Sequence, residues 1–460
     1  MNDWEGKHLV IVGAARQGLA LAKYLRKHGV KITITDQRDE KVLNAVQQEF
    51  QEGKINWVLG GHPIEILDDA DLVSLSGGVP LTIPLVQEAI QREIPLTNDS
   101  QVFMDIVSCP VIGITGSAGK TTTTLLVGKM AEDAFGENHT WVGGNIGNPL
   151  IAVVDQIKKN DIAVIELSSF QLELMNTAPK IACILNVTPN HLDRHGTMQE
   201  YTQVKARIIA FQSNSDIAVL NREDEGSWTL RSEVQGQLIS FGLNRPEAGI
   251  AGTYLKGDMI SYWDGSSTFD LVPIDSIRLR GEHNLMNTLA ACAVASAADI
   301  PAESMKNGVE TLAGVEHRLE YIRTWKEADW YNDSIATAPE RSIAAINSFT
   351  EPLVLLAGGR DKDLPWNDFS KLVLERVKHL ILFGEAADLI ERVLQAESEN
   401  GEIAIPYQKC ANLKEAVLKA ADVAKSGDVV LLSPGGTSFD EFIDFAERGE
   451  KFRKWIQELS

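Results

Sequence analysis

A glycine-rich segment from Gly116 to Thr122 has the residue types that bind a nucleotide triphosphate. It reads Gly-Ser-Ala-Gly-Lys-Thr-Thr and directly follows an apolar run at residues 111–115. A strand that leads through such a loop into a helix points several backbone N–H groups at phosphate oxygens. In such loops the lysine reaches the β- and γ-phosphates and the following hydroxyl binds Mg²⁺, which are the positions of Lys120 and Thr121. Ile114 stands where the strict G-x-x-x-x-G-K-[ST] pattern has its first glycine, yet the layout still predicts a phosphate site.

Three more residues are candidates for the same site. Glu166 ends an apolar run at 162–165, and open α/β sheets collect ligands at the carboxyl ends of their strands. A carboxylate beside a phosphate loop is well placed to hold Mg²⁺, with a helix cap as the alternative. His191 follows the run at 181–185, which favours a metal or phosphate role over the structural role usual for a lone histidine. Lys205, taken alone, is typical of a solvated lysine.

The elements that must position these residues alternate as strands and helices. Further apolar runs lie at 9–12, 31–35, 72–75, 95–97, 217–220, 353–357, 380–383 and 429–432, and stretches such as 201–211, 283–298 and 442–458 have helical periodicity. This alternation predicts an α/β fold with three domains. We expect a Rossmann-like domain at 1–99, a central P-loop domain with a mostly parallel sheet at 100–314, and a second Rossmann-like domain at 315–460. Residues 245–280 are predicted to form short antiparallel strands at the edge of the central sheet.

The first predicted strand leads into a glycine turn, from Gly13 to Gly18, and the second strand ends at Asp36. Strand, glycine turn, helix, strand and acidic residue is the layout of a nucleotide-binding βαβ unit. Ala15 occupies the middle glycine position of G-x-G-x-x-G, so a nucleotide site and a plain tight turn both remain open here.

Length and charge narrow the class of protein. The 460 residues exceed a single hydrophobic core, and 43 Lys and Arg against 64 Asp and Glu give a net charge of −21. This acidity argues against binding to nucleic acid or to an anionic membrane. The four cysteines show no C-x-x-C pairing, which disfavours a zinc site or a disulfide framework. With no signal peptide and no uncharged stretch of membrane-spanning length, we expect a cytoplasmic protein.

Seven short motifs occur in a fixed order along nearly the whole chain. They are T-G-x-x-G-K-T-T, E-x-S-S-F-Q-L, N-x-x-x-x-H-L-D-R-H, G-x-H-N-x-x-N, H-R-L-E, N-D-S-x-A-T and S-P-x-x-x-S-F-D-x-F. In these motifs the chain resembles the Mur ligase family, which builds the peptide of bacterial cell-wall precursors. Residues 143–149 and 170–173 are most similar to the family members that add D-glutamate.

The resemblance implies ATP-dependent ligation of D-glutamate to UDP-N-acetylmuramoyl-L-alanine, a step of peptidoglycan precursor synthesis. The carboxylate of the acceptor would become an acyl phosphate, and the amine of glutamate would then form the amide, with ADP and phosphate as the other products. The implied cofactor is Mg²⁺, as two ions, with ATP as co-substrate. The implied partners are these small molecules and neither nucleic acid nor membrane, and we expect a monomer whose third domain closes over ATP.

The resemblance also assigns roles to individual residues. UDP-substrate contacts would come from Arg16, Gln17, Gly18, Asp36, Gln37, Ser76, Gly77, Gly78, Asn145 and Ser168. ATP contacts would come from Gly116, Ser117, Ala118, Gly119, Lys120, Thr121, Thr122, Asn284, Asn287, Arg318 and Asp333. Amino-acid contacts would come from Thr337, Lys362, Ser438 and Phe445. Catalytic residues would be Lys120, Glu166, His191 and Lys205. Metal ligands would be Thr121, Glu166, His191 and Lys205, the last if its amine is carbamylated into a carboxylate-like group.

Two positions depart from the family's pattern. Ile335 stands where many D-glutamate ligases carry a lysine, and Ala338 replaces an asparagine. Loss of a cation weakens a site for a dicarboxylate unless another cation replaces it. Arg341 is a candidate replacement, although a solvated helix surface is its ordinary role. The added amino acid therefore stays open between D-glutamate, L-glutamate and another amino acid.

Other classes of protein fit the motifs less well. A folate polyglutamylating ligase is disfavoured by the UDP-type N-terminal segment. A P-loop NTPase switch without ligase activity would leave Asn145, His191 and Lys205 unexplained, and the guanine-specific N-K-x-D motif is absent from the sequence. A nicotinamide dehydrogenase would leave the glycine-rich loop without a role.

Overall fold

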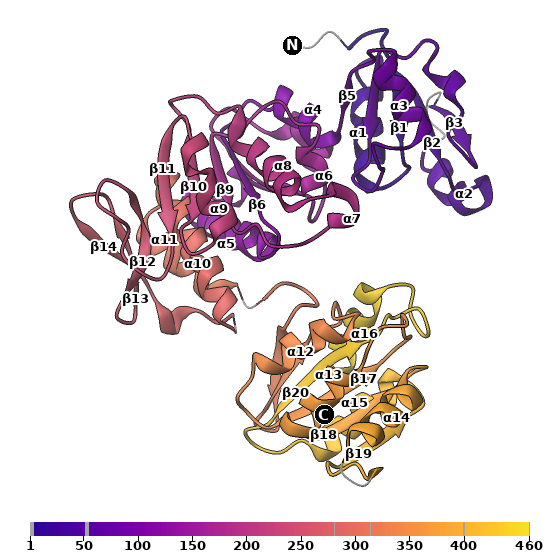
Figure 1. Ribbon diagram of the computed structural model, residues 1–460, viewed down its shortest axis with the longest axis vertical. Coiled ribbons are helices and arrows are strands. Elements are labelled where there is room, and N and C mark those ends of the chain that lie inside the picture. The colour runs from indigo at the N-terminus through magenta and orange to yellow at the C-terminus, as the bar shows by residue number, and fades with distance from the viewer. Residues whose placement is uncertain (1–3, 51–54, 280, 313, 399–400, 460) are drawn as a thin grey trace. The chain divides into compact units, whose positions relative to one another are not determined.

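The structure, a computed structural model, describes residues 4–50, 55–279, 281–312, 314–398 and 401–459 (Figure 1). The chain divides into two compact units, one made of Met1–Ile277 and His283–Thr311, the other of Arg278–Glu282 and Leu312–Ser460. The first unit carries a five-stranded and a nine-stranded sheet, and the second a six-stranded sheet. Three mostly parallel sheets confirm the predicted α/β class, while the domain boundaries near residues 99 and 314 stay predictions.

The five-stranded sheet is parallel throughout and has the strand order β3-β2-β1-β4-β5. The chain runs from β1 to β2 towards one edge of the sheet and from β4 to β5 towards the other edge. A crevice therefore opens at the carboxyl ends of the neighbouring strands β1 and β4. The strands are β1 (His8–Val12), β2 (Lys31–Asp36), β3 (Ile55–Leu59), β4 (Leu72–Leu75) and β5 (Leu96–Thr97). The helices are α1 (Arg16–Arg26), α2 (Glu40–Gln48), η1 (Ile64–Leu67), α3 (Pro84–Gln91) and α4 (Asp99–Ile106).

The nine-stranded sheet has the order β14-β13-β12-β11-β10-β9-β6-β8-β7, with β6 between β9 and β8. Pairing is parallel from β7 to β12 and antiparallel for β12–β13 and β13–β14, which confirms the antiparallel edge. The strands are β6 (Val111–Thr115), β7 (Thr140–Gly144), β8 (Ile162–Glu166), β9 (Ile181–Ile184), β10 (Ile217–Asn221), β11 (Gln237–Phe241), β12 (Ala251–Lys256), β13 (Met259–Trp263) and β14 (Thr268–Pro273). The α-helices are α5 (Lys120–Phe135), α6 (Ser169–Leu172), α7 (Leu192–His195), α8 (Met198–Ala210), α9 (Glu225–Trp228), α10 (Glu282–Ala297) and α11 (Ala302–Thr311). Short 3₁₀ helices are η2 (Glu137–His139), η3 (Leu150–Ala152), η4 (Val154–Gln156), η5 (Thr229–Glu233) and η6 (Ile274–Ser276).

The six-stranded sheet has the order β15-β16-β20-β17-β18-β19, and only the edge pair β15–β16 is antiparallel. Its central strands are apolar and buried on both faces, where two separate core clusters form, as expected for a parallel sheet covered by helices. The strands are β15 (Glu320–Trp325), β16 (Ala328–Asn332), β17 (Leu353–Gly358), β18 (Val377–Phe383), β19 (Tyr407–Cys410) and β20 (Val429–Gly435). The helices are α12 (Pro339–Asn347), α13 (Asn367–Arg376), α14 (Ala387–Glu397), α15 (Leu413–Val423) and α16 (Phe445–Gln457).

The helices of the described residues include none that is both long and apolar enough to cross a membrane. The four cysteine side chains are buried and free.

Candidate nucleotide and substrate sites

The glycine-rich loop joins β6 to α5 as predicted. Gly119, just before the helix, has φ +82, a conformation that favours glycine, and a Cβ there would collide with the Asn287 side chain of α10. Asn287 is thereby brought against the loop, and its side-chain amide donates to Asn284 Oδ1 over 3.0 Å. The loop, Asn284 and Asn287 thus gather at one place in the first unit. The Lys120 ammonium group lies across the loop, where it donates to Gly116 O at 2.8 Å.

A chain of hydrogen bonds joins this loop to the end of β8. The Thr121 hydroxyl donates to Glu166 Oε2 at 2.8 Å, and the Asn145 side-chain amide donates to Glu166 Oε1 at 2.8 Å. The Arg16 guanidinium, at the start of α1, donates to Asn145 O at 3.0 Å. Four residues predicted for different ligands therefore lie in one connected row.

The Thr121 and Glu166 oxygens fit a magnesium ion. Mg²⁺ takes an octahedron of oxygens at about 2.1 Å, which places neighbouring ligands about 3 Å apart. The observed separation of 2.8 Å between Thr121 Oγ1 and Glu166 Oε2 matches that spacing. Among the described residues, no group of three or more His, Cys, Asp or Glu side chains is placed so that it could hold a metal ion.

Lys205 is buried, contrary to what its type suggests when it is taken alone. Its side chain is only 1% exposed, and its Nζ lies 4.7 Å from the centre of the Tyr201 ring. Burial lowers the pKa of Lys205 to about 7, and the positive charge of Lys120 acts in the same direction. The Tyr201 hydroxyl lies 3.2 Å from Ser117 Oγ in the glycine-rich loop. Lys205 therefore lies beside the phosphate loop with a large fraction of neutral amine.

His191 lies near the carboxyl end of β8, where its ring contacts an aromatic side chain. Its backbone has φ 52, and its ring centre is 5.0 Å from that of Phe170 on α6. Ser168 caps α6, since its hydroxyl accepts from Gln171 N at 3.3 Å and the Gln171 side chain accepts from Ser168 N at 2.9 Å. The substrate role predicted for Ser168 stays a prediction beside this capping role.

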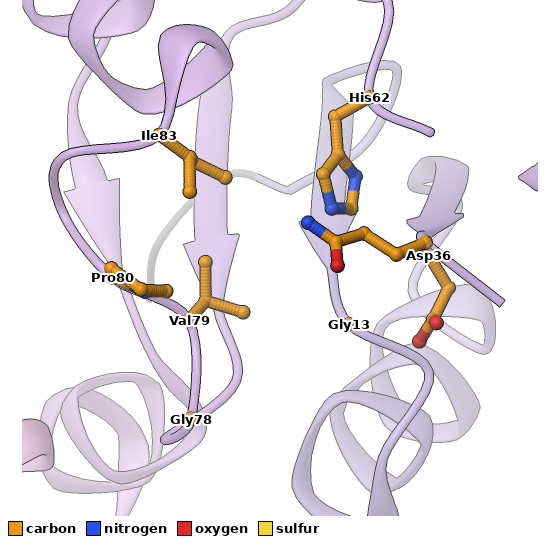
Figure 2. A pocket seen from close by; sticks show the side chains of 8 residues that line it. Gly13, Asp36, His62, Gly78, Val79, Pro80 and Ile83 are labelled. Carbon is orange, nitrogen blue, oxygen red and sulfur yellow. The ribbon is translucent and has the colours of Figure 1, made fainter. Parts of the chain in front are cut away.

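Three residues predicted to contact the UDP substrate, Asp36, Gln37 and Gly78, lie at the crevice beside β1. A cavity of about 180 Å³ opens there (Figure 2), lined by Gly13, Asp36, Gln37, His62, Gly78, Val79, Pro80 and Ile83. Ser76 donates to Gly13 O at 2.8 Å, and a Cβ on Gly18 would lie 2.7 Å from the same oxygen. Gly18 therefore allows α1 to pack closely on the turn, and residues 16–18 and 76–78 face each other.

Asp36 is committed to the protein itself. Its carboxylate accepts from Ala14 N at 2.7 Å and from the Arg38 guanidinium at 2.9 and 2.8 Å. These bonds from Arg38 hold the pKa of Asp36 well below its usual range. The carboxylate thus clamps the glycine turn to the end of β2, and its oxygens are already occupied by donors.

In the second unit, predicted residues follow β16, β17 and β20 at their carboxyl ends. Asp333, after β16, accepts from Ser433 Oγ at 2.8 Å and from Leu319 N at 3.3 Å. Burial raises the pKa of Asp333 to about 7, while Arg318 and Arg341 oppose that shift. Phe445, on α16, lies 6.2 Å from the ring of His317, which precedes Arg318. The structure thus gathers Arg318, Asp333 and Phe445.

Arg448 connects the loops that carry these residues, and its role was missed from the sequence. Its guanidinium is fully buried and donates to Ser334 Oγ and O, each at 2.9 Å, to Thr437 O at 3.0 Å and to Gly436 O at 3.1 Å. Ser438 follows in the same loop. In the sequence, Glu447-Arg448-Gly449 is typical of a solvated helix surface. Only the position of Arg448 beside Gly449, which packs closely against His317, could have indicated burial.

The other residues predicted to bind the amino acid differ in exposure: Lys362 is exposed, Thr337 is partly buried and Ser438 is only 2% exposed. Lys362 lies in the loop after β17, which pairs with the loop of Ser438 through Arg360 and Thr437. Arg341 donates to Ile335 O at 3.3 Å. A cation therefore reaches the loop in which Ile335 replaces the lysine of many D-glutamate ligases. Arg318 and Asp333, which are predicted to contact ATP, belong to this unit, whereas the glycine-rich loop belongs to the first unit.

Nearly the whole chain is similar to known proteins. Three family models match, described as Mur ligase MurD-like N-terminal domain at residues 7–98, Mur ligase middle domain at 114–295, and Mur ligase glutamate ligase domain at 317–436. A curated relative from Symbiobacterium thermophilum, named UDP-N-acetylmuramoylalanine–D-glutamate ligase, is 38% identical over 98% of this chain and 98% of its own length. One of the same name from Acetivibrio thermocellus is 36% identical over 100% of this chain and 99% of its own.

Solved structures share the fold at lower identity. The UDP-N-acetylmuramate–alanine ligase MurC of Thermotoga maritima is 18% identical, with a TM-score of 0.58 over 98% of this chain and 99% of that chain. MurF of Acinetobacter baumannii is 18% identical, with a TM-score of 0.56 over 100% of this chain and 92% of that chain.

Proposed function

The chain belongs to the Mur ligase family, and we propose that it joins D-glutamate to UDP-N-acetylmuramoyl-L-alanine in peptidoglycan precursor synthesis. ATP is consumed and ADP and phosphate are released. The observation that supports this most is the row Arg16, Asn145, Glu166 and Thr121, which links the UDP side of the first unit to its phosphate loop. We also propose that the protein acts as a cytoplasmic monomer.

The reaction needs activation because a carboxylate is a poor electrophile. An oxygen of the acceptor carboxylate attacks the γ-phosphorus of ATP, the bond to the β-phosphate oxygen breaks, and an acyl phosphate and ADP result. The glutamate amine then attacks the acyl carbon and loses a proton, and phosphate leaves with its electron pair. Lys120 and the backbone N–H groups of the loop hold the phosphates during transfer.

Magnesium is the proposed cofactor, as two ions held by Thr121, Glu166, His191 and carbamylated Lys205. When bound, Mg²⁺ offsets the negative charge of a carboxylate approaching a triphosphate. The amine of Lys205 is suited to carbamylation because its lowered pKa leaves it partly neutral near pH 7. Its neutral nitrogen adds to carbon dioxide and loses a proton, which gives an anionic ligand. Intact-mass measurement before and after removal of carbon dioxide would detect this change.

We propose that the second unit binds the glutamate through Thr337, Lys362, Ser438 and Phe445, with Arg341 as an additional cation. Arg341 reaches the loop through its hydrogen bond to Ile335 O. A dicarboxylate needs more than one cation, and Arg341 supplies the charge that Ile335 lacks. Arg318 and Asp333 of the same unit are proposed to contact the nucleotide.

The proposal is tested by following an oxygen atom. With the acceptor carboxylate labelled with oxygen-18, the acyl-phosphate route transfers one labelled oxygen to the released phosphate. Mass spectrometry of that phosphate should show the label only when acceptor, ATP and glutamate are all present. ATP turnover that ignores the acceptor, with unlabelled phosphate, would instead indicate an NTPase without ligase activity.

A further inference from the structure

His62 lines the crevice cavity and lies outside the residues assigned to the substrate so far. It follows β3 and lies on the same side of the cavity as Asp36, across from Val79 and Ile83 (Figure 2). Its ring is partly buried. A ring with two nitrogens at a ligand cavity can either donate or accept a hydrogen bond there, so its protonation decides what it recognises.

Thr35 determines which ring nitrogen of His62 carries the proton. The Thr35 hydroxyl, fully buried on β2, lies 2.8 Å from Gly61 O and 2.9 Å from His62 Nδ1. A carbonyl oxygen only accepts, so the single hydrogen of the hydroxyl goes to Gly61. The hydroxyl must therefore accept from Nδ1–H of His62. In the neutral ring, Nε2 is then left with a lone pair.

That lone pair is available to a ligand. Among the described residues, no donor hydrogen-bonds to His62 Nε2. This atom is also not one of the buried atoms that lack a partner, so solvent or a ligand can reach it. Burial lowers the pKa of His62, against the opposing effect of Asp36, so the ring is neutral near pH 7. The Asp36 carboxylate does not compete as an acceptor, because Ala14 and Arg38 already occupy it. The cavity therefore offers a histidine acceptor.

We propose that His62 Nε2 accepts the imide N–H of the uracil ring of the UDP-linked substrate and so selects uracil over cytosine. The inference rests on the proposed function, which supplies a uridine nucleotide. Uracil carries a hydrogen on N3 between two carbonyls, whereas N3 of cytosine carries a lone pair. Against cytosine, two lone pairs would face each other and neither would be satisfied. His62 thus acts as a specificity residue, and Thr35 sets its tautomer.

The test compares binding of UDP and CDP to the full-length chain by calorimetry. The natural chain should prefer UDP by on the order of tenfold, the effect of one hydrogen bond to a neutral group. His62→Phe keeps a ring of similar size without an acceptor, and it should lose that preference mainly through weaker UDP binding. Thr35→Val should reduce the preference because the ring can change tautomer, and Thr35→Ser, which keeps the hydroxyl, should retain it.

A second measurement needs no variant. Nitrogen-15 shifts of the natural protein should show His62 with a protonated Nδ1 and a bare Nε2 near pH 7, and UDP should move the Nε2 signal. A proton on Nε2, or an unchanged UDP preference in His62→Phe, would overturn the inference. If amide formation with D-glutamate persists in that case, the proposed function stands without it. A natural chain that binds no UDP and forms no amide would contradict both.

Discussion

The Thr121 hydroxyl and the Glu166 carboxylate lie 2.8 Å apart, although 45 residues separate them in the chain. The contact exists because β6 and β8 are neighbouring parallel strands, paired in register from Val111↔Ala163 to Ile114↔Glu166. The loop after β6 therefore meets the last side chain of β8. A protein of net charge −21 can bind a triphosphate in this way, because cations and N–H groups are concentrated at one sheet edge.

Replacing Glu166 by glutamine tests this contact. The variant keeps the length of the side chain and an oxygen for Thr121, but it loses the charge that we propose holds Mg²⁺. We expect substrate-dependent phosphate release to fall by at least about 100-fold, since even partners of metal ligands change activity by about 10- to 100-fold. Thr121→Ser, which keeps the hydroxyl, serves as the matched control and should retain most of the activity. Unimpaired turnover in Glu166→Gln would remove this carboxylate from the metal site.

Arg448→Met should destabilise the second unit. The carbonyls of Ser334, Gly436 and Thr437 would lose their shared donor inside the fold. Thr437 O would keep its bond from Arg360 N, whereas the carbonyls of Ser334 and Gly436 would be left without a donor among the described residues. A buried acceptor without a partner costs about 1–3 kcal/mol, so the free energy of unfolding should fall by about 2–6 kcal/mol. Urea unfolding measures this change. Lys454→Met, on an exposed part of the same helix, should change the free energy by no more than about 0.5 kcal/mol, and equal effects of the two variants would refute the role of Arg448.

Asp333 should make stability depend on pH between about 4 and 7. The folded protein binds a proton on Asp333 up to about pH 7, whereas the unfolded chain releases it near its ordinary pKa of about 3.9. The folded state thus holds more protons in this window, and the free energy of unfolding falls as pH rises, by at most about 1.4 kcal/mol per pH unit. Urea unfolding at several pH values should show a smaller fall in Asp333→Asn. The same pH slope in both proteins would contradict the raised pKa.

Arg341→Met should weaken the binding of glutamate specifically. Loss of one charged hydrogen-bond donor from a dicarboxylate site corresponds to about 1.5–3 kcal/mol, or about a 10- to 100-fold rise in the KM for glutamate. The KM values for ATP and for the UDP-linked acceptor should stay unchanged. Adding Ile335→Lys to this variant returns a cation to the loop and should restore glutamate binding. A rise in all three KM values would indicate a general structural effect instead.

The buried apolar strands were predictable from the sequence, and the edge pair β15–β16 of the second unit was not. β1, β6, β8 and β17 are buried on both faces and therefore read as continuous apolar runs. β15 and β16 at the edge mix charged residues with aromatic ones, and no such run marks them. Helix α16 was predicted from residue 442, but it begins at Phe445 because Asp444 caps it by accepting from Glu447 N.

The site was predictable where the residues follow strands or form motifs. Glu166 and Lys120 each lie at the end of a recognisable strand or loop. Nothing in the sequence indicated that Lys205 is buried. Its neighbour Tyr201 is one turn away on the same helix, but the glycine-rich loop that Tyr201 contacts is distant in sequence. Arg448 and His62 were missed because the acceptors that define their roles are distant in sequence: Ser334 lies in the turn after β16, and Thr35 lies on β2.

The proposed ligase activity is best tested by measuring Mg-ATP-dependent phosphate release with UDP-N-acetylmuramoyl-L-alanine and either D-glutamate, L-glutamate or no amino acid. D-glutamate should support phosphate release together with formation of the amide product, whereas neither L-glutamate nor the amino-acid-free reaction should do so. Release with L-glutamate alone would keep the chemistry and contradict the D-specificity of a site that contains Ile335. Release that is equal in all three reactions would contradict the ligase function itself.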